Sequence, residues 1–214
     1  MILGVIPARL NSTRFPSKVI FPLKGKPIIE HVYEKALQSN LLNKVIVAVD
    51  SEETKNVINC QNIIMTSDKH QSGTDRVAEV ANNFNCDIVV NIQGDEPGID
   101  PLLIDKLIQL FEDPDVEMAS IASTDLKEDD LNNDNVVKVN LDKENNAISF
   151  IRNNLNPEST YYRHIGIYAY RKNTLNLFTS LTQSDNEKNH RLEQLRALDN
   201  NIAIKLLILS LIHI

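Results

Sequence analysis

The sequence has little cysteine and no excess of positive charge. Its 214 residues include two cysteines, Cys60 and Cys86, which are far apart and match no metal-ligand spacing. We expect both to be small buried side chains in a reducing compartment, the cytoplasm. The formal net charge of −7 argues against general nucleic-acid binding, because a phosphate backbone selects basic surfaces.

Long apolar segments and the common nucleotide fingerprints are also missing. The apolar run before Arg9 is too short for a signal peptide, and the apolar residues 202–214 are too few to span a bilayer. We therefore expect no membrane partner. No G-x-x-x-x-G-K-[ST] motif occurs, and the first strand–helix turn lacks G-x-G-x-x-G. The chain thus carries neither the P-loop nor the dinucleotide-binding fingerprint.

Strand-like and helix-like segments alternate through the first 124 residues. Buried β-branched runs predict strands over residues 2–6, 44–50, 63–65, 87–93 and 117–124. Apolar stripes predict helices over 27–39, with Pro27 in the first turn, around 77–84 and over 100–111. Asp50 or Ser51 can cap a further short helix, whose first turn holds Glu52 and Glu53. Pro7 is expected to end the first strand, because proline gives no N–H to a ladder. The alternation predicts an α/β fold with a doubly wound, mostly parallel sheet.

The pattern changes after Asp125. Segments 136–141 and 147–152 flank a turn at 142–146, which predicts a small antiparallel β-hairpin insertion. A strand over 163–170, helices near 172–181 and 187–199, and a strand over 202–207 are expected to follow. We expect a single domain over 1–214, with the hairpin insertion around 134–162 and an atypical tail at 208–214.

A basic polar loop follows the first expected strand. Arg9, Arg14 and Lys18 lie there among small hydroxyl residues. Ligands of open α/β sheets bind at the carboxyl ends of strands, and arginine forks with a lysine charge suit a polyphosphate. The alternative is a solvated basic loop. The density of cations, hydroxyls and prolines in so short a segment favours the phosphate-binding interpretation.

Asp95 lies directly after the fourth expected strand and next to Gly94, which would let a ligand approach the backbone. A carboxylate there can hold Mg²⁺ together with substrate phosphates. Alternatively, Asp95 or Glu96 only caps a turn. The basic loop favours the magnesium site, because cations and magnesium are what phosphoryl transfer needs.

Other polar residues each have two interpretations. Ser72, Gly73 and Thr74 begin a helix, where free N–H groups could bind an anion or a base edge, but plain N-capping explains the hydroxyls equally well. Arg152 and His164, taken alone, would usually be structural. Glu193 and Gln194 would usually lie on a solvated helix face.

Seven short motifs occur in order along the chain. They are IPAR (6–9), STRFPSK (12–18), GKP (25–27), HQSGT (70–74), NIQGDEP (91–97), RHIGIY (163–168) and LEQLR (192–196). Together they resemble the CMP-Kdo synthetases, the 3-deoxy-manno-octulosonate cytidylyltransferases, from residue 1 to about residue 205. Each motif alone is weak, but the ordered set is specific.

The resemblance implies a nucleotide-diphospho-sugar transferase-like fold and a reaction. CTP and the acid sugar Kdo would give CMP-Kdo and pyrophosphate, for lipopolysaccharide biosynthesis. The anomeric hydroxyl of the sugar would attack the α-phosphorus of CTP, while Mg²⁺ draws charge from the phosphates. The resemblance also implies a homodimer through the 136–152 hairpin region.

The matching motifs imply the site residues. The nucleotide would be bound by Ala8, Arg9, Arg14, Lys18, Gln71, Ser72 and Gly73. The sugar would be bound by Gln93, Arg152, His164, Tyr168, Glu193 and Gln194, with an arginine facing the Kdo carboxylate. Catalysis would fall to Arg9, Lys18 and Asp95, and Asp95 would bind Mg²⁺.

Three departures from the family pattern stand out. Ser17 and Val19 replace a usual Gly and Pro, and residues 153–157 differ from the usual segment on the sugar side. The family continues past the final strand to an aspartate that is a second magnesium ligand, which has no counterpart after Leu207. We therefore expect CTP binding with weak turnover.

Two other functions stay open at the level of sequence. One is transfer to another acid sugar such as sialic acid, although those enzymes usually open with a Gly-Gly-Ser-Lys loop in place of residues 11–14. The other is a nucleotide-binding or dimerising protein without catalysis.

Overall fold

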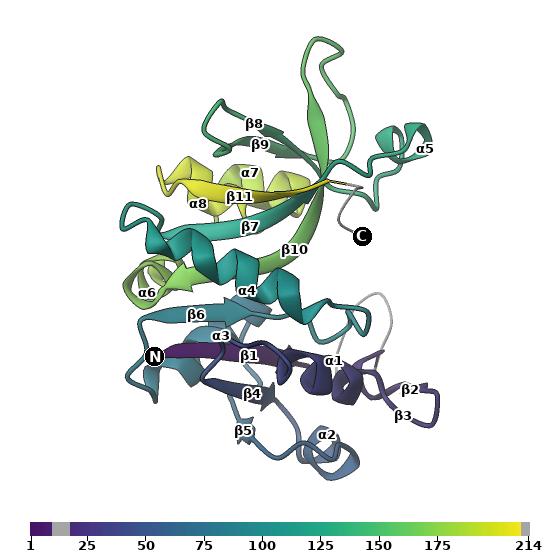
Figure 1. Cartoon of the computed structure of the whole chain (residues 1–214), viewed down its shortest axis with the longest axis vertical. Coiled ribbons are helices and arrows are strands. Elements are labelled where there is room, and N and C mark those ends of the chain that lie inside the picture. Colours follow the sequence, from purple (N-terminus) through teal and green to yellow (C-terminus); the bar gives the residue numbers. More distant parts are fainter. Residues whose placement is uncertain (10–17, 211–214) are drawn as a thin grey trace. The chain divides into compact units, whose positions relative to one another are not determined.

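A computed structural model describes residues 1–9 and 18–210, whose contacts group into two compact units (Figure 1). Unit 1 comprises residues 1–108 and 169–179, and unit 2 comprises the described residues of 109–168 and 180–214. The single domain expected from the sequence stays a prediction. Arg14 of the basic loop lies outside the described residues.

The sheet of unit 1 is parallel. Its strands β1 (Ile2–Ala8), β4 (Lys44–Val49), β5 (Ile63–Met65) and β6 (Ile88–Asn91) lie in the order β6-β1-β4-β5 (Figure 1). Val5 of β1 is in register with Ile46 of β4 and Asn91 of β6. The inner strands are buried almost throughout, which explains their continuous β-branched runs. The expected mostly parallel sheet is confirmed.

In its described part, unit 1 contains α1 (Ile28–Ala36), α2 (Glu52–Val57), α3 (Gly73–Asn82) and, apart from their last residues, α4 (Pro101–Gln109) and α6 (Lys172–Ser180). Helix α1 buries the predicted stripe, including Ile29 and Val32, and Pro27 is its N-cap residue, not part of its first turn. Ser51 caps α2 as expected, its hydroxyl accepting a hydrogen bond from the Thr54 N–H at 3.1 Å.

A small hairpin before α1 was not predicted. It follows a short 3₁₀ helix, η1 (Lys18–Ile20), and consists of β2 (Pro22–Leu23) and β3 (Lys26–Pro27), joined through Lys24 and Gly25. Both turn residues have positive φ, 49° and 88°, which glycine adopts freely. Two-residue strands are too short to leave an alternating pattern in the sequence.

Pro7 does not end the first strand, contrary to the expectation. Strand β1 continues to Ala8 because its pairing with β4 reaches Ala8 and Val49. The pairing with β6 ends earlier, at Val5 and Asn91. The Val5 carbonyl accepts a hydrogen bond from the Ile92 N–H, so the backbone polar groups of Val5 face β6. These groups alternate in direction along a strand, so the nitrogen of Pro7 faces the same side, beyond the last residue pair with β6. The missing N–H of Pro7 therefore breaks no ladder bond.

Unit 2 has its own strands and short helices. Its strands β7 (Met118–Ser123), β10 (Tyr161–Arg171) and β11 (Ile204–Leu209) lie in the order β11-β7-β10, and the part of β10 up to Tyr168 belongs to the unit. The predicted hairpin is confirmed, because β8 (Lys138–Leu141) pairs antiparallel with β9 (Ala147–Ile151) and with β10. The helical segments are η2 (Leu110–Glu112), α5 (Glu128–Leu131), α7 (Asp185–His190) and α8 (Leu195–Asp199).

Two boundary predictions in unit 2 are wrong. The helix expected over 187–199 is two helices, because Arg191 ends α7 in the left-handed region with a φ of 53°. Glu193 and Gln194 therefore lie between helices, and Gln194 is 7% exposed, so neither belongs to a solvated helix face. The last strand also extends beyond 207: Ile208 pairs with Ala122, so residues 208 and 209 continue the sheet.

The two cysteines differ in their surroundings. Cys86 is buried as predicted, whereas Cys60 is only partly buried because it lies in the loop between α2 and β5. Both thiols are free. None of the helices within residues 1–9 and 18–210 is long and apolar enough to cross a membrane.

Candidate functional site

The carboxyl ends of the parallel strands of unit 1 form one edge of its sheet. Ala8 ends β1 in the core and is followed by the exposed Arg9. Asp50 follows β4, and Thr66 follows β5. Strand β6 leads to the segment that contains Asp95. Three predicted site residues, Ala8, Arg9 and Asp95, thus follow or end strands at the edge where ligands of such sheets bind.

Lys18 and Asp95 form an ion pair at this edge. Lys18 Nζ lies 2.7 Å from Asp95 Oδ2, and the two side chains are 42% and 39% exposed. So exposed a pair adds little to stability. Its significance is positional: it brings together the lysine predicted for the triphosphate and the carboxylate predicted for the metal, which are 77 residues apart in sequence.

The structure gives a packing reason for a glycine at position 94, which the sequence did not indicate. A Cβ at this position would lie 3.0 Å from the Pro7 carbonyl oxygen. The absence of a side chain therefore lets the segment after β6 pass close to the end of β1. The expected approach of a ligand to Gly94 stays a prediction.

The residues present fit a magnesium ion that is shared with a substrate. Among residues 1–9 and 18–210, no group of three or more His, Cys, Asp and Glu side chains could hold a metal ion. An all-protein cage is therefore excluded for the described part of the chain. Magnesium in nucleotide sites is usually held by one or two carboxylates together with phosphate oxygens and water. Asp95 alone would satisfy the protein's share of such a site.

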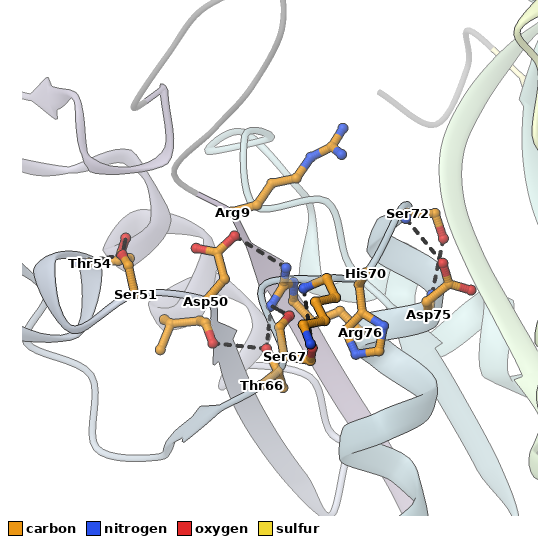
Figure 2. A network of polar contacts seen from close by, with 12 residues as sticks. Arg9, Asp50, Ser51, Thr54, Thr66, Ser67, His70, Ser72, Asp75 and Arg76 are labelled. Carbon is orange, nitrogen blue, oxygen red and sulfur yellow. Dashed lines mark hydrogen bonds and ion pairs between the residues drawn. The ribbon is translucent and has the colours of Figure 1, made fainter.

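The polar loop after β5 ends in a capping box. The Ser72 hydroxyl accepts from the Asp75 N–H at 3.1 Å, and Asp75 Oδ2 accepts from the Ser72 N–H at 3.1 Å (Figure 2). The capping interpretation of Ser72 is thus confirmed, and its contact with a nucleotide stays a prediction. Nearby, Arg9 Nη1 reaches the Gln71 carbonyl oxygen at 3.5 Å, a long contact that leaves both side chains exposed.

Replacing Ser72 by Ala tests both roles of this residue. We expect the free energy of unfolding in urea to fall by about 1 kcal/mol, the usual cost of a lost N-cap. Ser51→Ala, which removes the cap of α2, should cost a similar amount. Isothermal titration calorimetry should show weaker CTP binding in Ser72→Ala alone. Equal CTP affinity in the two variants would leave Ser72 with capping only.

In unit 2, two predicted sugar-site residues lie close together. His164 Nε2 is 2.9 Å from the hydroxyl of the fully buried Ser120, which also donates to the Ile167 carbonyl at 2.8 Å. The His164 ring contacts the Phe150 ring edge-on at 5.0 Å and the Tyr168 ring at 5.5 Å. The structure therefore joins His164 and Tyr168 through a serine that sequence reasoning missed.

Both titratable rings are held neutral. Burial lowers the pKa of His164 from 6.5 to about 3. Burial also raises the pKa of Tyr168 well above 10, helped by the negative charge of Glu193 and opposed by a hydrogen bond with Ser120. These groups can therefore exchange neutral hydrogen bonds with a ligand. A positive charge for a carboxylate has to come from another residue.

The lowered pKa of His164 predicts a stability that depends on pH. The folded value lies below the unfolded one, so the contribution is full above about pH 6.5 and is lost as the pH falls toward 3. At about 1.4 kcal/mol per pKa unit, the unaltered protein should lose about 2 kcal/mol more than His164→Gln between pH 7 and pH 5. Urea unfolding at both pH values measures this. Equal losses in the two proteins would contradict a neutral buried His164.

Arg152 is placed by backbone acceptors. It follows β9, and its Nη1 donates to the Asp134 carbonyl at 2.8 Å. The fully buried Lys138 holds the same turn, because its Nζ donates to the Asn133 carbonyl at 2.9 Å and to the Arg152 carbonyl. Burial lowers the pKa of Lys138. The predicted sugar-site arginine thus stands on a turn fixed by a lysine that the sequence did not single out.

A buried ion pair lies beside Glu193. Arg196 Nε and Nη2 donate to the two carboxylate oxygens of Glu187 at 2.8 and 2.6 Å, and both side chains are about 5% exposed. Arg196 Nη2 also lies 3.8 Å from Glu193 Oε1. These residues belong to unit 2, whereas the remaining predicted sugar-site residue, Gln93, belongs to unit 1.

Four of the buried polar groups that sequence reasoning missed bear on the candidate site: Arg76, Ser120, Lys138 and Arg196. The only signal for three of them was a charged residue within an otherwise apolar or periodic run. Ser120 gave no signal, because a serine in a buried strand is common.

Comparisons with known proteins agree over nearly the whole chain. The model of the cytidylyltransferase family matches residues 3–205. A 3-deoxy-manno-octulosonate cytidylyltransferase from Chloroherpeton thalassium is 42% identical, over 97% of this chain and 89% of that protein. The enzyme of the same name from Pelobacter propionicus is 40% identical, over 95% and 88%.

Solved structures give the same result. The structure of CMP:2-keto-3-deoxy-manno-octonic acid synthetase complexed with CTP superposes with a TM-score of 0.91 at 35% identity, covering 98% of this chain and 90% of that one. A 4-diphosphocytidyl-2C-methyl-D-erythritol synthase from Anaerococcus prevotii has a TM-score of 0.62 at 12% identity, over 97% and 88%, and shares the fold alone.

Proposed function

The chain belongs to the 3-deoxy-manno-octulosonate cytidylyltransferases, and on that premise we propose how its residues serve the reaction. It is a nucleotidyltransferase that activates Kdo with CTP, giving CMP-Kdo and pyrophosphate. The observation that carries this function is the likeness, along nearly the full chain, to enzymes of that name. A role in lipopolysaccharide biosynthesis belongs to the proposal.

Unit 1 would bind the nucleotide. Arg9 and Lys18 are cations at the carboxyl edge of a parallel sheet, suited to the triphosphate together with Arg14. Residues 71–73 at the start of α3 would contact the nucleotide through backbone groups and the Ser72 side chain. Asp95 would hold Mg²⁺, which when bound neutralises charge on the phosphates. Lys18, now paired with Asp95, can donate to phosphate oxygens from the same place.

The sugar would be recognised by residues of unit 2, and the contact expected from Gln93 of unit 1 stays a prediction. Arg152 is proposed to face the Kdo carboxylate, because burial keeps His164 neutral and Lys138 is committed to backbone carbonyls. His164 and Tyr168 would hydrogen-bond sugar hydroxyls in their neutral forms. Glu193 and Gln194 would add acceptors and donors from the segment before α8.

Pyrophosphate release tests the proposed reaction. The protein, CTP, Kdo and Mg²⁺ should together release pyrophosphate and form CMP-Kdo in equal amounts. Omitting Kdo, or replacing it by N-acetylneuraminate, should reduce release to the background rate. Equally fast release with N-acetylneuraminate would mean that the substrate is another acid sugar. No release with any acid sugar would leave a nucleotide-binding protein.

Nucleotide choice gives a separate prediction. At matched magnesium concentration, CTP should raise the melting temperature more than ATP or GTP, because a ligand that binds only the folded state stabilises it more the larger the ratio of its concentration to its Kd. The motivation is the HQSGT motif at residues 70–74 together with the absence of both common nucleotide fingerprints. Equal shifts with all three nucleotides at matched concentration would contradict CTP selection.

A cytoplasmic homodimer completes the proposal. Two free cysteines support a reducing compartment. The β8–β9 hairpin supports a self-association surface, since Ile148 on β9 is 59% exposed. Sedimentation equilibrium of the purified protein tests the dimer.

A further inference from the structure

Arg76 is a deeply buried cation near the carboxyl edge of the unit 1 sheet. It lies on α3, is 1% exposed, and extends its guanidinium toward the loop ends (Figure 2). Arg76 Nη2 is 3.2 Å from Asp50 Oδ2, and Nη1 donates to the Ser67 carbonyl at 3.1 Å. Nη1 also donates to the Thr66 hydroxyl. At this burial, Arg76 cannot itself contact a substrate.

These partners come from different segments of unit 1. Asp50 follows β4, while Thr66 and Ser67 follow β5 and open the loop that leads to Ser72. The Thr66 hydroxyl in turn donates to the Val49 carbonyl at 2.8 Å, which ties the loop to the end of β4. One planar guanidinium thus fixes two strand ends and its own helix in a single geometry.

The same loop is held a second time from α3. Glu79 lies one helical turn after Arg76, and its Oε2 accepts from the Ser67 N–H at 3.0 Å and contacts His70 Nε2. Ser67 is therefore fixed through its carbonyl by Arg76 and through its N–H by Glu79. Between Ser67 and the cap at Ser72 lies Gln71, whose carbonyl is near Arg9.

The charge of Arg76 is balanced locally. Burial lowers the pKa of Arg76, and the carboxylates of Asp50 and Glu79 raise it, but an arginine stays protonated. Asp50 is itself 13% exposed and shares the ion pair. A cation neutralised in this way positions the groups that it hydrogen-bonds more than it attracts a phosphate over a long distance.

We propose that Arg76 is a positioning residue for CTP: it holds residues 66–72 against the end of β4 and so presents Gln71, Ser72 and the start of α3 to the nucleotide. The inference rests on the proposed function, because it assigns these loop residues to CTP. It concerns only the CTP side of the reaction.

Arg76→Lys is the first test. A lysine keeps the positive charge beside Asp50 but offers no planar fork, so it cannot hold Thr66 and Ser67 in the same geometry. We expect the KM for CTP to rise about tenfold, while kcat and the KM for Kdo stay within about twofold. Loss of overall stability alone would instead lower the active fraction and reduce kcat without this split.

Thr66→Val and Thr54→Val form a milder, matched pair. Each removes one buried hydroxyl: that of Thr66 contacts Arg76, whereas that of Thr54 lies 2.9 Å from the Ser51 hydroxyl. We expect similar losses of stability in the two variants. The KM for CTP should rise about threefold in Thr66→Val and stay unchanged in Thr54→Val. If Arg76→Lys fails to fold, the two threonine variants test the positioning role of Arg76 instead.

Three results would overturn the proposal: an unchanged KM for CTP in Arg76→Lys, an equal rise of both KM values, or an equal effect of the two threonine variants. Failure of the proposed function is visible separately, as no pyrophosphate release by the unaltered enzyme. Calorimetric CTP binding by the unaltered protein and by Arg76→Lys then still tests the role of Arg76. Equal affinities there would refute it.

Discussion

Replacing Asp95 by Asn is expected to lower kcat for pyrophosphate release by about 10²–10³-fold, the scale on which one electrostatic catalytic group contributes. The proposed role of Asp95 is to hold Mg²⁺ beside the phosphates, and an amide is a poor ligand for this hard cation. Positioning and charge stabilisation supply most of phosphoryl-transfer catalysis. Steady-state kinetics at saturating CTP and Kdo measure the effect.

The stability of Asp95→Asn should change little, because the Lys18–Asp95 pair is about 40% exposed on both sides. Glu52→Gln is a matched control, since it removes the acid of another exposed lysine pair in unit 1, with Lys55 at 3.4 Å. It should leave kcat unchanged. If Asp95→Asn keeps the activity of the unaltered enzyme, Asp95 only neutralises Lys18.

Replacing Arg196 by Ala is expected to destabilise the protein by about 3–5 kcal/mol. The substitution leaves the Glu187 carboxylate buried without its bidentate partner, and an uncompensated buried charge carries a cost of that size. Urea unfolding measures the loss. It is a large fraction of the 5–15 kcal/mol that stabilises a typical domain.

Two further variants separate the charge effect from lost packing. Lys188→Ala removes an exposed partner of Asp185 at 3.9 Å and should cost at most about 0.5 kcal/mol. Glu187→Met combined with Arg196→Met should recover much of the stability, because a buried ion pair can often be replaced by apolar side chains of similar volume. A double variant as unstable as Arg196→Ala would mean that packing, not the unpaired charge, causes the loss.

Much of the fold could be predicted because its signals are local. The β-branched run that became β4, the serine cap of α2 and the turn between β8 and β9 each specify structure within a few residues. Parallel pairing then brings the carboxyl ends of the unit 1 strands to one edge, so the basic loop and Asp95 could be expected together. The pair between Lys18 and Asp95 agrees with that expectation.

The identities of the substrates also followed from the sequence, through an ordered set of motifs and not through any single residue. Fold and family were therefore determined by the sequence itself. The individual roles of His164 and Tyr168 were not, because a lone polar residue beside apolar ones has the same appearance whether it is structural or functional. Their neutrality depends on burial by segments that are distant in sequence.

Only the tertiary structure decided which charged side chains are buried and where the local rules have exceptions. Arg76 and Arg196 look like polar residues of helical segments, yet both are nearly inaccessible, and the acceptors of Arg76 lie as far as 26 residues away in sequence. Pro7 stays within its strand because β6 stops pairing before it. Sequence periodicity indicates where polar residues recur along one segment. It cannot indicate which distant carboxylate, carbonyl or strand end will hydrogen-bond a buried polar group, because that partner is brought near only by packing.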